Sequence, residues 1–364
     1  MADGIADDVR ARSADPEAAA PPLGAPGADA GVPASATADV GATAADGTVD
    51  PTRDGLRTWT AIRDEVAKAV IGAEKSLELL VMALLADGHA LLEDVPGVGK
   101  TLLARAFSRA LGLTFARVQG TPDLLPGDVT GSSIIEGGTF RFVPGPVFHN
   151  VLLVDEVNRA TPRTQSALLE AMQERQVSIE GTTRPLPDPF VVLATQNPIE
   201  YEGTFSLPEA QLDRFLVRIA IGYPDGAGEA RIARRHVDRA EPLDDVHQVV
   251  SGERIRALRE AVRGVHVSDE VTAYVVALVE ATRHHADIAL GGSPRATVGL
   301  FRTAQARAFL AGRSFVIPDD VQAVAPAVLA HRLRLDLDRE LRGASVVAVV
   351  SDVLSATPVP PTAG

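Results

Sequence analysis

One loop between an apolar strand and a helix constrains most strongly what this chain can fold into. Residues 91–101 read Leu-Leu-Glu-Asp-Val-Pro-Gly-Val-Gly-Lys-Thr, and a helical pattern follows over 102–110. Glycines allow backbone N–H groups to turn around an anion, and the N-terminus of the following helix adds a positive dipole end. The closing Gly-Lys-Thr therefore predicts a phosphate-binding loop of the Walker A kind.

Most side chains of this loop have an expected task. Lys100 would supply an ammonium group for β- and γ-phosphates, and the Thr101 hydroxyl could ligate Mg²⁺. Asp94 stands where the pattern G-x-x-x-x-G-K-[ST] has its first glycine, and a short Gly-Lys-Thr run could also be a helix-capping turn. The chain has only three lysines, so a lysine at this position favours the phosphate interpretation. We expect the loop to hold the nucleotide through Pro96, Gly97, Val98, Gly99, Lys100, Thr101 and Leu102.

A second signal is a strand that ends in two carboxylates. Residues 151–154 are continuously apolar, which is typical of a strand buried on both faces of a parallel sheet, and Asp155 and Glu156 follow them. Asp155 would hold Mg²⁺ directly or through water, and Glu156 would orient and polarise the attacking water. The alternative is an acid pair that caps a helix. Together with Lys100 and Thr101, the pair favours nucleotide hydrolysis over nucleotide binding alone.

A side-chain amide and an arginine are weaker candidates. Asn197 follows the apolar strand 190–194, and open α/β sheets place ligand-contacting groups at that end of a strand. An Asn before Pro198 is equally a common turn residue. Arg214 could act as an arginine finger that reaches the γ-phosphate of a neighbouring subunit. It could also be a surface residue that pairs with Asp213 or Glu209.

Arg295 stands at a position where a positive charge is unfavourable. Ser293 and Pro294 are typical of a helix start, so the cation would fall in the first turn, where the helix dipole disfavours positive charge. A nearby anion such as a phosphate would explain the placement. The alternative is an exposed arginine that tolerates the unfavourable position.

Composition and charge exclude several classes of protein. The chain has no cysteine, which excludes disulfides, thiol catalysis and Cys-ligated zinc. The N-terminus lacks the basic start and apolar core of a signal peptide, and no apolar run reaches the ~20 residues of a membrane span. We therefore expect a cytoplasmic protein without a membrane span. The net charge is −13, of which residues 1–54 contribute −7, so neither part has the basic surface of a nucleic-acid binder.

The order of the expected elements gives the fold class. Residues 1–53 are rich in Ala, Pro, Gly and Asp and are predicted to be disordered. Residues 54–223 alternate strands with helices and include two hairpins, at 133–142 and 176–186. A capping box at Ser206-x-x-Glu209 predicts a helix to Phe215, and a last strand is expected over 217–221. Residues 224–360 are predicted to be helical, at about 228–239, 251–263, 268–285, 295–311, 318–330 and 339–354. The pattern indicates an α/β core of the P-loop nucleoside triphosphatase (NTPase) type, with a parallel sheet sandwiched by helices, followed by an all-α lid domain.

These motifs together resemble the MoxR family of AAA+ ATPases over about residues 56–360. The most specific run is 153–174, Leu-Val-Asp-Glu-Val-Asn-Arg-Ala-Thr-Pro-Arg-Thr-Gln-Ser-Ala-Leu-Leu-Glu-Ala-Met-Gln-Glu. Other matching runs are residues 93–101, 194–198, 207–215 and 292–296. Asp94 in the first glycine position agrees with the family's loops, whereas Thr161 and Arg163 are mild variants.

The resemblance implies roles for several residues. Asn197 would be the sensor 1 residue, Arg214 the arginine finger that acts on the next subunit, and Arg295 the sensor 2 residue of the lid. Ile71 and Gly72 would lie near the adenine. The family implies an Mg²⁺-ATP-driven, ring-forming, chaperone-like machine, expected to be a hexamer. It would remodel a protein client, with a von Willebrand factor A domain protein as an expected partner.

Two other functions stay open at this point. The chain could be a nucleotide-gated protein-binding module with slow or partner-dependent turnover, because that function needs the same site. It could also be a nucleic-acid motor, because helicase-related AAA+ proteins share the two hairpins. The hairpin at 176–186 offers only Arg184 and no aromatic residue, which disfavours the nucleic-acid motor.

Overall fold

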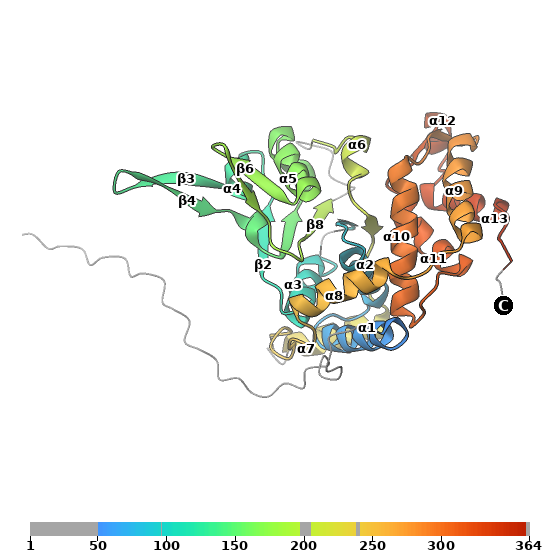
Figure 1. Cartoon of the computed structure of the whole chain (residues 1–364), viewed down its shortest axis with the longest axis horizontal. Coiled ribbons are helices and arrows are strands. Elements are labelled where there is room, and N and C mark those ends of the chain that lie inside the picture. Colours follow the sequence, from blue (N-terminus) through green and yellow to red (C-terminus); the bar gives the residue numbers. More distant parts are fainter. Residues whose placement is uncertain (1–49, 96, 197–204, 238–240, 362–364) are drawn as a thin grey trace, which may run out of the picture. The chain divides into compact units, whose positions relative to one another are not determined.

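A five-stranded parallel sheet holds together the described part of the chain in this computed structural model, which covers residues 50–95, 97–196, 205–237 and 241–361 (Figure 1). The strands run in the order β2-β5-β8-β1-β9. Their bounds are β1 Ala90–Glu93, β2 Phe115–Gln119, β5 Val151–Asp155, β8 Val191–Gln196 and β9 Val217–Ile219. All neighbouring strands pair in parallel. The predicted fold class is confirmed.

The central strands are buried on both faces, as their unbroken apolar runs predict. In β5, Val151 and Leu153 belong to one apolar core, and Leu152 and Val154 belong to the other. This alternation follows from the two-residue period of a strand, which directs successive side chains to opposite faces. The strand segment therefore has no solvent-facing position between its ends.

Helices cover the two faces of the sheet. The first core includes side chains from α1 (Pro51–Ala67), α2 (Glu74–Leu85), α3 (Lys100–Ala110) and α8 (Gly252–Arg263). The second core includes side chains from α4 (Pro126–Thr130), the 3₁₀ turn η1 (Pro146–Phe148) and α5 (Pro162–Glu174). Another 3₁₀ turn, η2 (Val157–Arg159), directly follows the two carboxylates. Thr161 caps α5 through its side chain, and Met172 is buried.

Both predicted hairpins are present and lie side by side. One consists of β3 (Gly131–Glu136) and β4 (Thr139–Pro144), and the other of β6 (Gln176–Ile179) and β7 (Thr182–Pro185). The Arg184 guanidinium lies 4.1 Å from the ring centroid of Phe142, and Ser133 Oγ donates to Glu180 at 2.7 Å. These contacts fix the base of the first hairpin, whose tip extends away from the sheet (Figure 1).

The helical region after β9 contains α7 (Gly226–Val237), α9 (Asp269–His284), α10 (Pro294–Leu310), α11 (Pro318–Leu329), α12 (Leu337–Leu341) and α13 (Val346–Ala356). The single helix expected at 339–354 is wrong. Gly343 adopts a φ of +85° between α12 and α13, and this left-handed backbone ends the first helix. The expectation of no strand beyond 223 is also wrong, because β10 (Ile288–Leu290) pairs with β11 (Arg334–Leu335).

The helix before the last core strand and that strand itself are both shorter than predicted. The helix α6 spans only Glu209–Leu212, with Pro208 rather than Ser206 as its N-cap residue and no side-chain cap bond. The Glu209 carboxylate instead accepts a bond from Arg334 at 3.1 Å, so it does not complete a capping box. The strand β9 ends at Ile219 rather than Ile221, and the Ile221 N–H donates to the Asp94 carboxylate instead.

Two buried histidines give the fold a defined acid sensitivity. Val192 N donates to His89 Nδ1 at 3.0 Å, so His89 Nε2 carries the proton and donates to Met172 O. Burial lowers the pKa of His89 to about 3, and burial also lowers the pKa of His331 well below its ordinary value. Both imidazoles are therefore neutral in the folded protein at pH values where the unfolded chain takes up protons.

We expect the free energy of unfolding to fall between pH 7 and pH 5, by about 2 kcal/mol for His89 and in the same direction for His331. The unfolded imidazole binds a proton below about pH 6.5, whereas the folded one resists it, so this stability is present above pH 6.5 and is lost as the pH falls toward 3. Denaturant titrations across this range would measure it. The exposed His284→Gln variant should show the same slope, and a flat profile from pH 7 to pH 5 would contradict the prediction.

Candidate functional site

Two adjoining cavities lie at the carboxyl ends of the core strands, and both are lined by Gly97, Gly99 and Leu102. The larger, of about 800 Å³, is mainly apolar and lies between the phosphate loop and α7. Its other lining residues include Ile71, Gly72, Val98, Ile221, Gly222, Tyr223, Pro224, Ile232 and Arg235. The smaller, of about 440 Å³, is lined by the polar or charged side chains of Lys100, Thr101, Arg117, Gln119, Asp155, Glu156 and Thr195. An apolar cavity beside one that carries charged side chains suits a base joined to phosphates.

The phosphate loop has the backbone that its glycines predict. Gly97 and Gly99 have φ values of +87° and +89°, a left-handed conformation that favours glycine. A Cβ at either residue would meet no atom within 4 Å, so backbone conformation rather than space requires glycine there. Gly99 is also the N-cap of α3, whose first residue is Lys100. The loop thus ends at a helix N-terminus that could hold an anion.

Lys100 lies among acceptors and carboxylates. Its Nζ donates to the main-chain carbonyl of Asp94 at 2.5 Å. Burial lowers the pKa of Lys100, while Asp94, Asp155, Glu156 and Glu93 counteract the shift by favouring the charged form. The ammonium group is thus held beside the smaller cavity by interactions that a phosphate could replace.

The two carboxylates at the end of β5 are held by the neighbouring strands. Asp155 accepts from Arg117 Nε at 2.5 Å and, at 3.3 Å, from the Thr195 hydroxyl. Glu156 has a left-handed φ of +54° and accepts from Gln119 Nε2 at 2.8 Å. The Glu156 N–H donates to Thr195 Oγ1 at 2.8 Å. Because β2 and β8 both flank β5, these partners approach the acid pair from either side.

Sequence reasoning missed Arg117, Gln119 and Thr195. Arg117 and Gln119 are two residues apart on β2 and therefore share one side of the strand. Two long polar side chains at the carboxyl end of a core strand were the available signal. The sequence does not reveal which strand lies next to β5, so it could not assign them to Asp155 and Glu156.

The donor set fits Mg²⁺ in one specific way. Thr101 and Asp155 line the same cavity, and the described residues contain no cluster of three or more His, Cys, Asp or Glu side chains that could hold a metal ion. Mg²⁺ commonly takes one or two protein oxygens and completes its shell with water and phosphate oxygens. A hydroxyl and a carboxylate beside a phosphate loop match that requirement.

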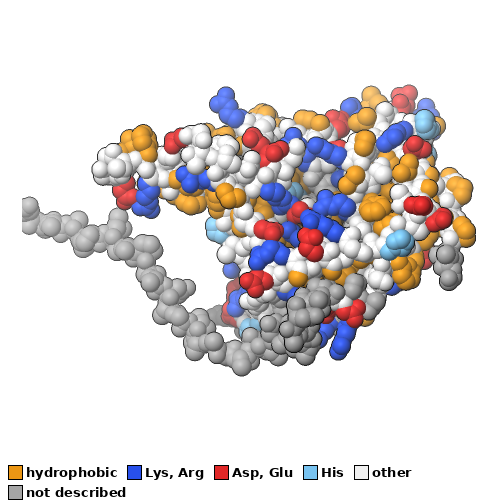
Figure 2. Space-filling view, in the orientation of Figure 1, with side chains coloured by type: hydrophobic (Ala, Val, Ile, Leu, Met, Phe, Trp, Pro, Cys, Tyr) orange, Lys and Arg blue, Asp and Glu red, His pale blue; other side chains and the backbone are white. Residues whose placement is uncertain are grey.

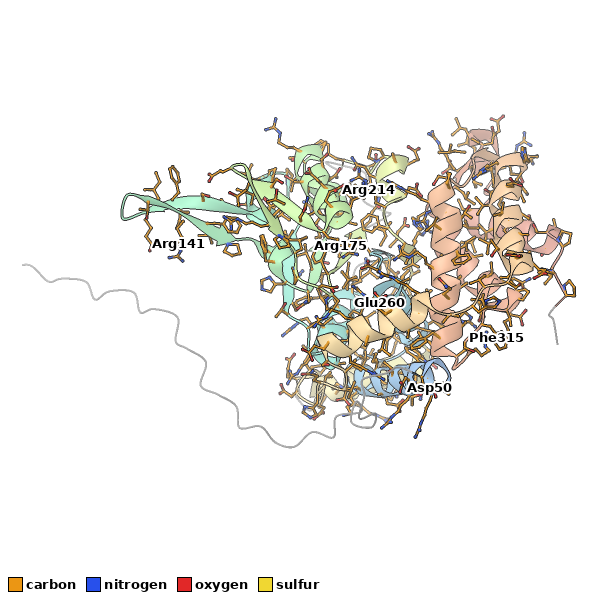
Figure 3. The ribbon with its side chains drawn as sticks, viewed as in Figure 1. Asp50, Arg141, Arg175, Arg214, Glu260 and Phe315 are labelled. Atoms are coloured by element: carbon orange, nitrogen blue, oxygen red, sulfur yellow. The ribbon has the colours of Figure 1, made fainter. Side chains whose placement is uncertain are left out.

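Arg214 and Arg295 line a different cavity, at the opposite edge of the sheet. This arginine cleft, of about 530 Å³, is also lined by Arg175, Arg302 and Arg332 and shares no residue with the other two cavities. It includes Asp87, Gly88 and His89, which precede β1, whereas the phosphate loop follows β1. Figure 2 shows Lys and Arg side chains gathered in the middle of this face, and Figure 3 shows Arg175 and Arg214 between α5 and α10.

Asp213 holds the two sides of the arginine cleft together. Its carboxylate accepts from Ser293 Oγ at 2.8 Å and pairs with Arg332 at 2.8 Å. Ser293 caps α10, as predicted, so this bond places the helix start that carries Arg295 beside the segment that carries Arg214. Arg332 is buried, and removing one partner of such a buried pair typically costs 3–5 kcal/mol.

Three arginines of this cleft have no carboxylate partner among the described residues. Arg214, Arg295 and Arg302 form no ion pair within the part of the chain that the structure describes, and Arg214 Nε is buried without a hydrogen-bond partner there. Burial lowers the pKa of Arg302, with Asp87 acting in the opposite direction. Buried donors are normally satisfied, so the cleft is suited to an anion. The predicted site residues Asn197 and Pro96 lie outside the described residues.

Comparison with known proteins decides the family. The model described as "ATPase family associated with various cellular activities (AAA)" matches residues 89–217, and the AAA lid domain matches 280–353. Chaperone MoxR1 of Mycobacterium tuberculosis is 43% identical over 307 residues, covering 81% of each chain. The chain belongs to the MoxR family of AAA+ ATPases.

Two further comparisons agree with this assignment. The uncharacterized protein YeaC of Bacillus subtilis is 45% identical over 82% of this chain and 93% of its own length. The crystal structure of a candidate ATPase from Cytophaga hutchinsonii aligns with a TM-score of 0.80 and 38% identity, covering 85% of this chain and 97% of that one. This MoxR-family protein is thus an ATP hydrolase, and no helix among its described residues is long and apolar enough to cross a membrane.

Substitution at the smaller cavity should separate nucleotide binding from turnover. We expect Lys100→Ala to weaken ATP binding and Glu156→Gln to retain binding while turnover falls about 100-fold or more, because only the second removes a candidate general base. Fluorescent-nucleotide titration and phosphate release would measure the two. The exposed Lys75→Ala and Glu170→Gln variants are matched controls that should behave as wild type. Full hydrolysis in either site variant would contradict the assignment.

Proposed function

We propose that this protein hydrolyses Mg²⁺-ATP at sites shared between neighbouring subunits of a homo-oligomeric ring, and that it remodels protein clients. One observation carries the proposal: the arginine cleft and the phosphate loop lie at opposite edges of the sheet. Both β1 and β9 run from the cleft to the nucleotide cavity, since Asp87 precedes β1 and Arg214 precedes β9. The paired strands β1 and β9 separate the two halves within one chain, so a second chain would have to bring them together.

The residues would divide the work as follows. Ile71, Gly72 and Leu102 would contact the adenine side, and residues 97–101 would hold the phosphates. Thr101 and Asp155 would hold Mg²⁺, which supplies charge neutralisation for the leaving phosphates. Glu156 would take a proton from the attacking water. Gln119 would orient the Glu156 carboxylate, and Thr195 would hold the Glu156 main chain, through the bonds described above. Arg214 and Arg295 of one subunit would stabilise negative charge on the next subunit's γ-phosphate.

Mixing two inactive variants tests the shared site. Arg214→Ala keeps its own phosphate loop, and Glu156→Gln keeps its own arginine cleft. Each variant alone should lose on the order of 10³-fold or 10²-fold in turnover, respectively. An equimolar mixture should regain about a quarter of wild-type activity, because a random ring pairs the intact halves at that frequency.

Two matched controls accompany this mixing experiment. Arg214→Ala mixed with the Arg214→Ala/Glu156→Gln double variant contains no intact pair of halves and should stay inactive. The exposed Arg163→Ala variant should stay active by itself. Absence of recovery in mixtures that sedimentation shows to be assembled would contradict the shared site.

The tip of the β3–β4 hairpin supports a client-remodelling function. Ile135 and Phe140 face each other across the two strands and are 70% and 75% exposed. Large apolar side chains at such exposure, on a projecting hairpin, suit contact with apolar segments of another protein (Figure 2). Arg184 of the other hairpin is engaged with Phe142, which further disfavours the nucleic-acid motor.

An aggregation assay tests this part of the proposal. The Ile135→Ser/Phe140→Ser variant should hydrolyse ATP as wild type but lose protection of a model client, reduced α-lactalbumin, from aggregation. The matched control is Leu341→Ser, which removes an apolar side chain that is 78% exposed on α12. Equal protection by all three proteins would contradict a role of the hairpin tip.

The remaining details of the proposal rest on the family or, for the location and the domain division, on the sequence pattern. They are a hexameric ring, a von Willebrand factor A domain partner, cytoplasmic location and the division into a tail (1–53), a core (54–223) and a lid (224–360). Within the core, Asn197 would act as the sensor 1 residue. Sedimentation would measure the ring size, and turnover that appears only with a partner would instead favour the nucleotide-gated module.

A further inference from the structure

Asp94 occupies a glycine position of the phosphate-loop pattern, and its carboxylate is fully engaged. Oδ1 accepts from Val95 N at 2.8 Å, while Oδ2 accepts from Ile221 N at 2.7 Å and from Gly222 N at 2.6 Å. Hydrogen bonds to an ionised acceptor are short and are stronger than neutral ones. A glycine at this position would make none of these three bonds.

The two distant N–H groups lie just beyond the end of a strand ladder. The pairing of β1 with β9 ends at Leu92 and Ile219, and Ile221 and Gly222 follow. Gly222 then adopts a φ of +74°, which turns the chain toward α7. The Asp94 carboxylate thus fixes the point at which the chain leaves the sheet. We call residues 220–225 the β9–α7 linker.

The segments on both sides of this contact contribute to the walls of the nucleotide cavity, although Asp94 itself does not line it. Gly97 and Gly99 of the phosphate loop form one wall, and residues 221–224 of the linker form another. Within the linker, Tyr223 is 74% exposed and lines the cavity. Asp94 also accepts from Lys100 Nζ through its main-chain carbonyl, so one residue contacts the phosphate-binding lysine and the opposite wall.

We propose that Asp94 is a positioning residue that couples the phosphate loop to the β9–α7 linker. A bound phosphate competes with the Asp94 carbonyl for the Lys100 ammonium group, and a change at that carbonyl is transmitted through the same residue's carboxylate to Ile221 and Gly222. Phosphate occupancy thereby sets the position of the wall that carries Tyr223 and leads into α7. The inference rests on the proposed nucleotide site and adds to it a route from the phosphates to the helical lid.

Two variants at Asp94 and one matched control test the coupling. Asp94→Gly restores the ordinary phosphate-loop residue, and Asp94→Ala removes the carboxylate without adding backbone freedom. The control is Glu93→Gln, which removes the ion pair of Glu93 with Arg218 (2.8 Å) between the same two strands but leaves the linker bonds intact. Each protein is studied as the full chain, with amide hydrogen exchange in the nucleotide-free state and with saturating ADP, and with fluorescent-ADP titration.

In the nucleotide-free state, both Asp94 variants should exchange faster at Ile221 and Gly222, and Glu93→Gln should match wild type. ADP affinity should fall about tenfold in both variants, as expected for the loss of charge-assisted bonds that pre-organise a wall. ADP should still protect the start of α3 in these variants but should no longer protect residues 221–223. A residue with only a structural role would lower overall stability without separating these two regions.

Wild-type exchange and wild-type ADP affinity in Asp94→Gly would overturn the inference, because Asp94 would then be an ordinary loop substitution. If Asp94→Gly does not fold, Asp94→Asn, which keeps one acceptor oxygen, should lie between wild type and Asp94→Ala in both measurements. Failure of wild type to bind ADP would contradict the nucleotide site instead. The nucleotide-free exchange data would still decide whether Asp94 holds the linker.

Discussion

The parallel pairing of β1 with β8 and β9 is the constraint on which the other features depend. Backbone hydrogen bonds, together with burial of β1 and β8 on both faces, make these strands a fixed spacer between two charged edges. One edge carries the phosphate loop and the acid pair, and the other carries the arginine cleft. In the proposed function, these two edges are complementary halves of one reaction site, which a second copy of the chain would complete.

The two edges of the sheet also differ in whether their charged groups have partners within the chain. At the phosphate edge, Asp155 and Glu156 accept bonds from neighbouring strands, so the acids are oriented before any ligand arrives. At the arginine edge, Arg332 is paired with Asp213, but Arg214 keeps a buried Nε without a partner among the described residues. Burial of an unsatisfied donor is unfavourable unless an acceptor completes it, and in the proposed function a neighbouring subunit's phosphate would be that acceptor.

Local signals were sufficient for most of the fold. The unbroken apolar run 151–154 correctly predicted a strand buried on both faces, and the Ser293-Pro294 pair correctly predicted the start of α10. The predictions failed where a distant partner decides the outcome. The Glu209 carboxylate accepts a bond from Arg334, which is 125 positions away, and β10 forms only because β11 pairs with it. No local pattern records such a competition.

The sequence by itself determined the chemistry available to this protein: a glycine-rich loop, one lysine, an acid pair and arginines at two helix ends. These properties follow from residue type and short-range spacing, because backbone conformation and helix ends are set within a few residues. Only the tertiary structure decided which groups act together. Strand order brought Arg117 and Gln119 beside the acid pair, joined Asp94 to Gly222, and placed Arg214 and Arg295 across the sheet from Lys100. The physical reason is that side-chain proximity in a parallel sheet depends on how strands are ordered, and that order is fixed by packing of the whole chain.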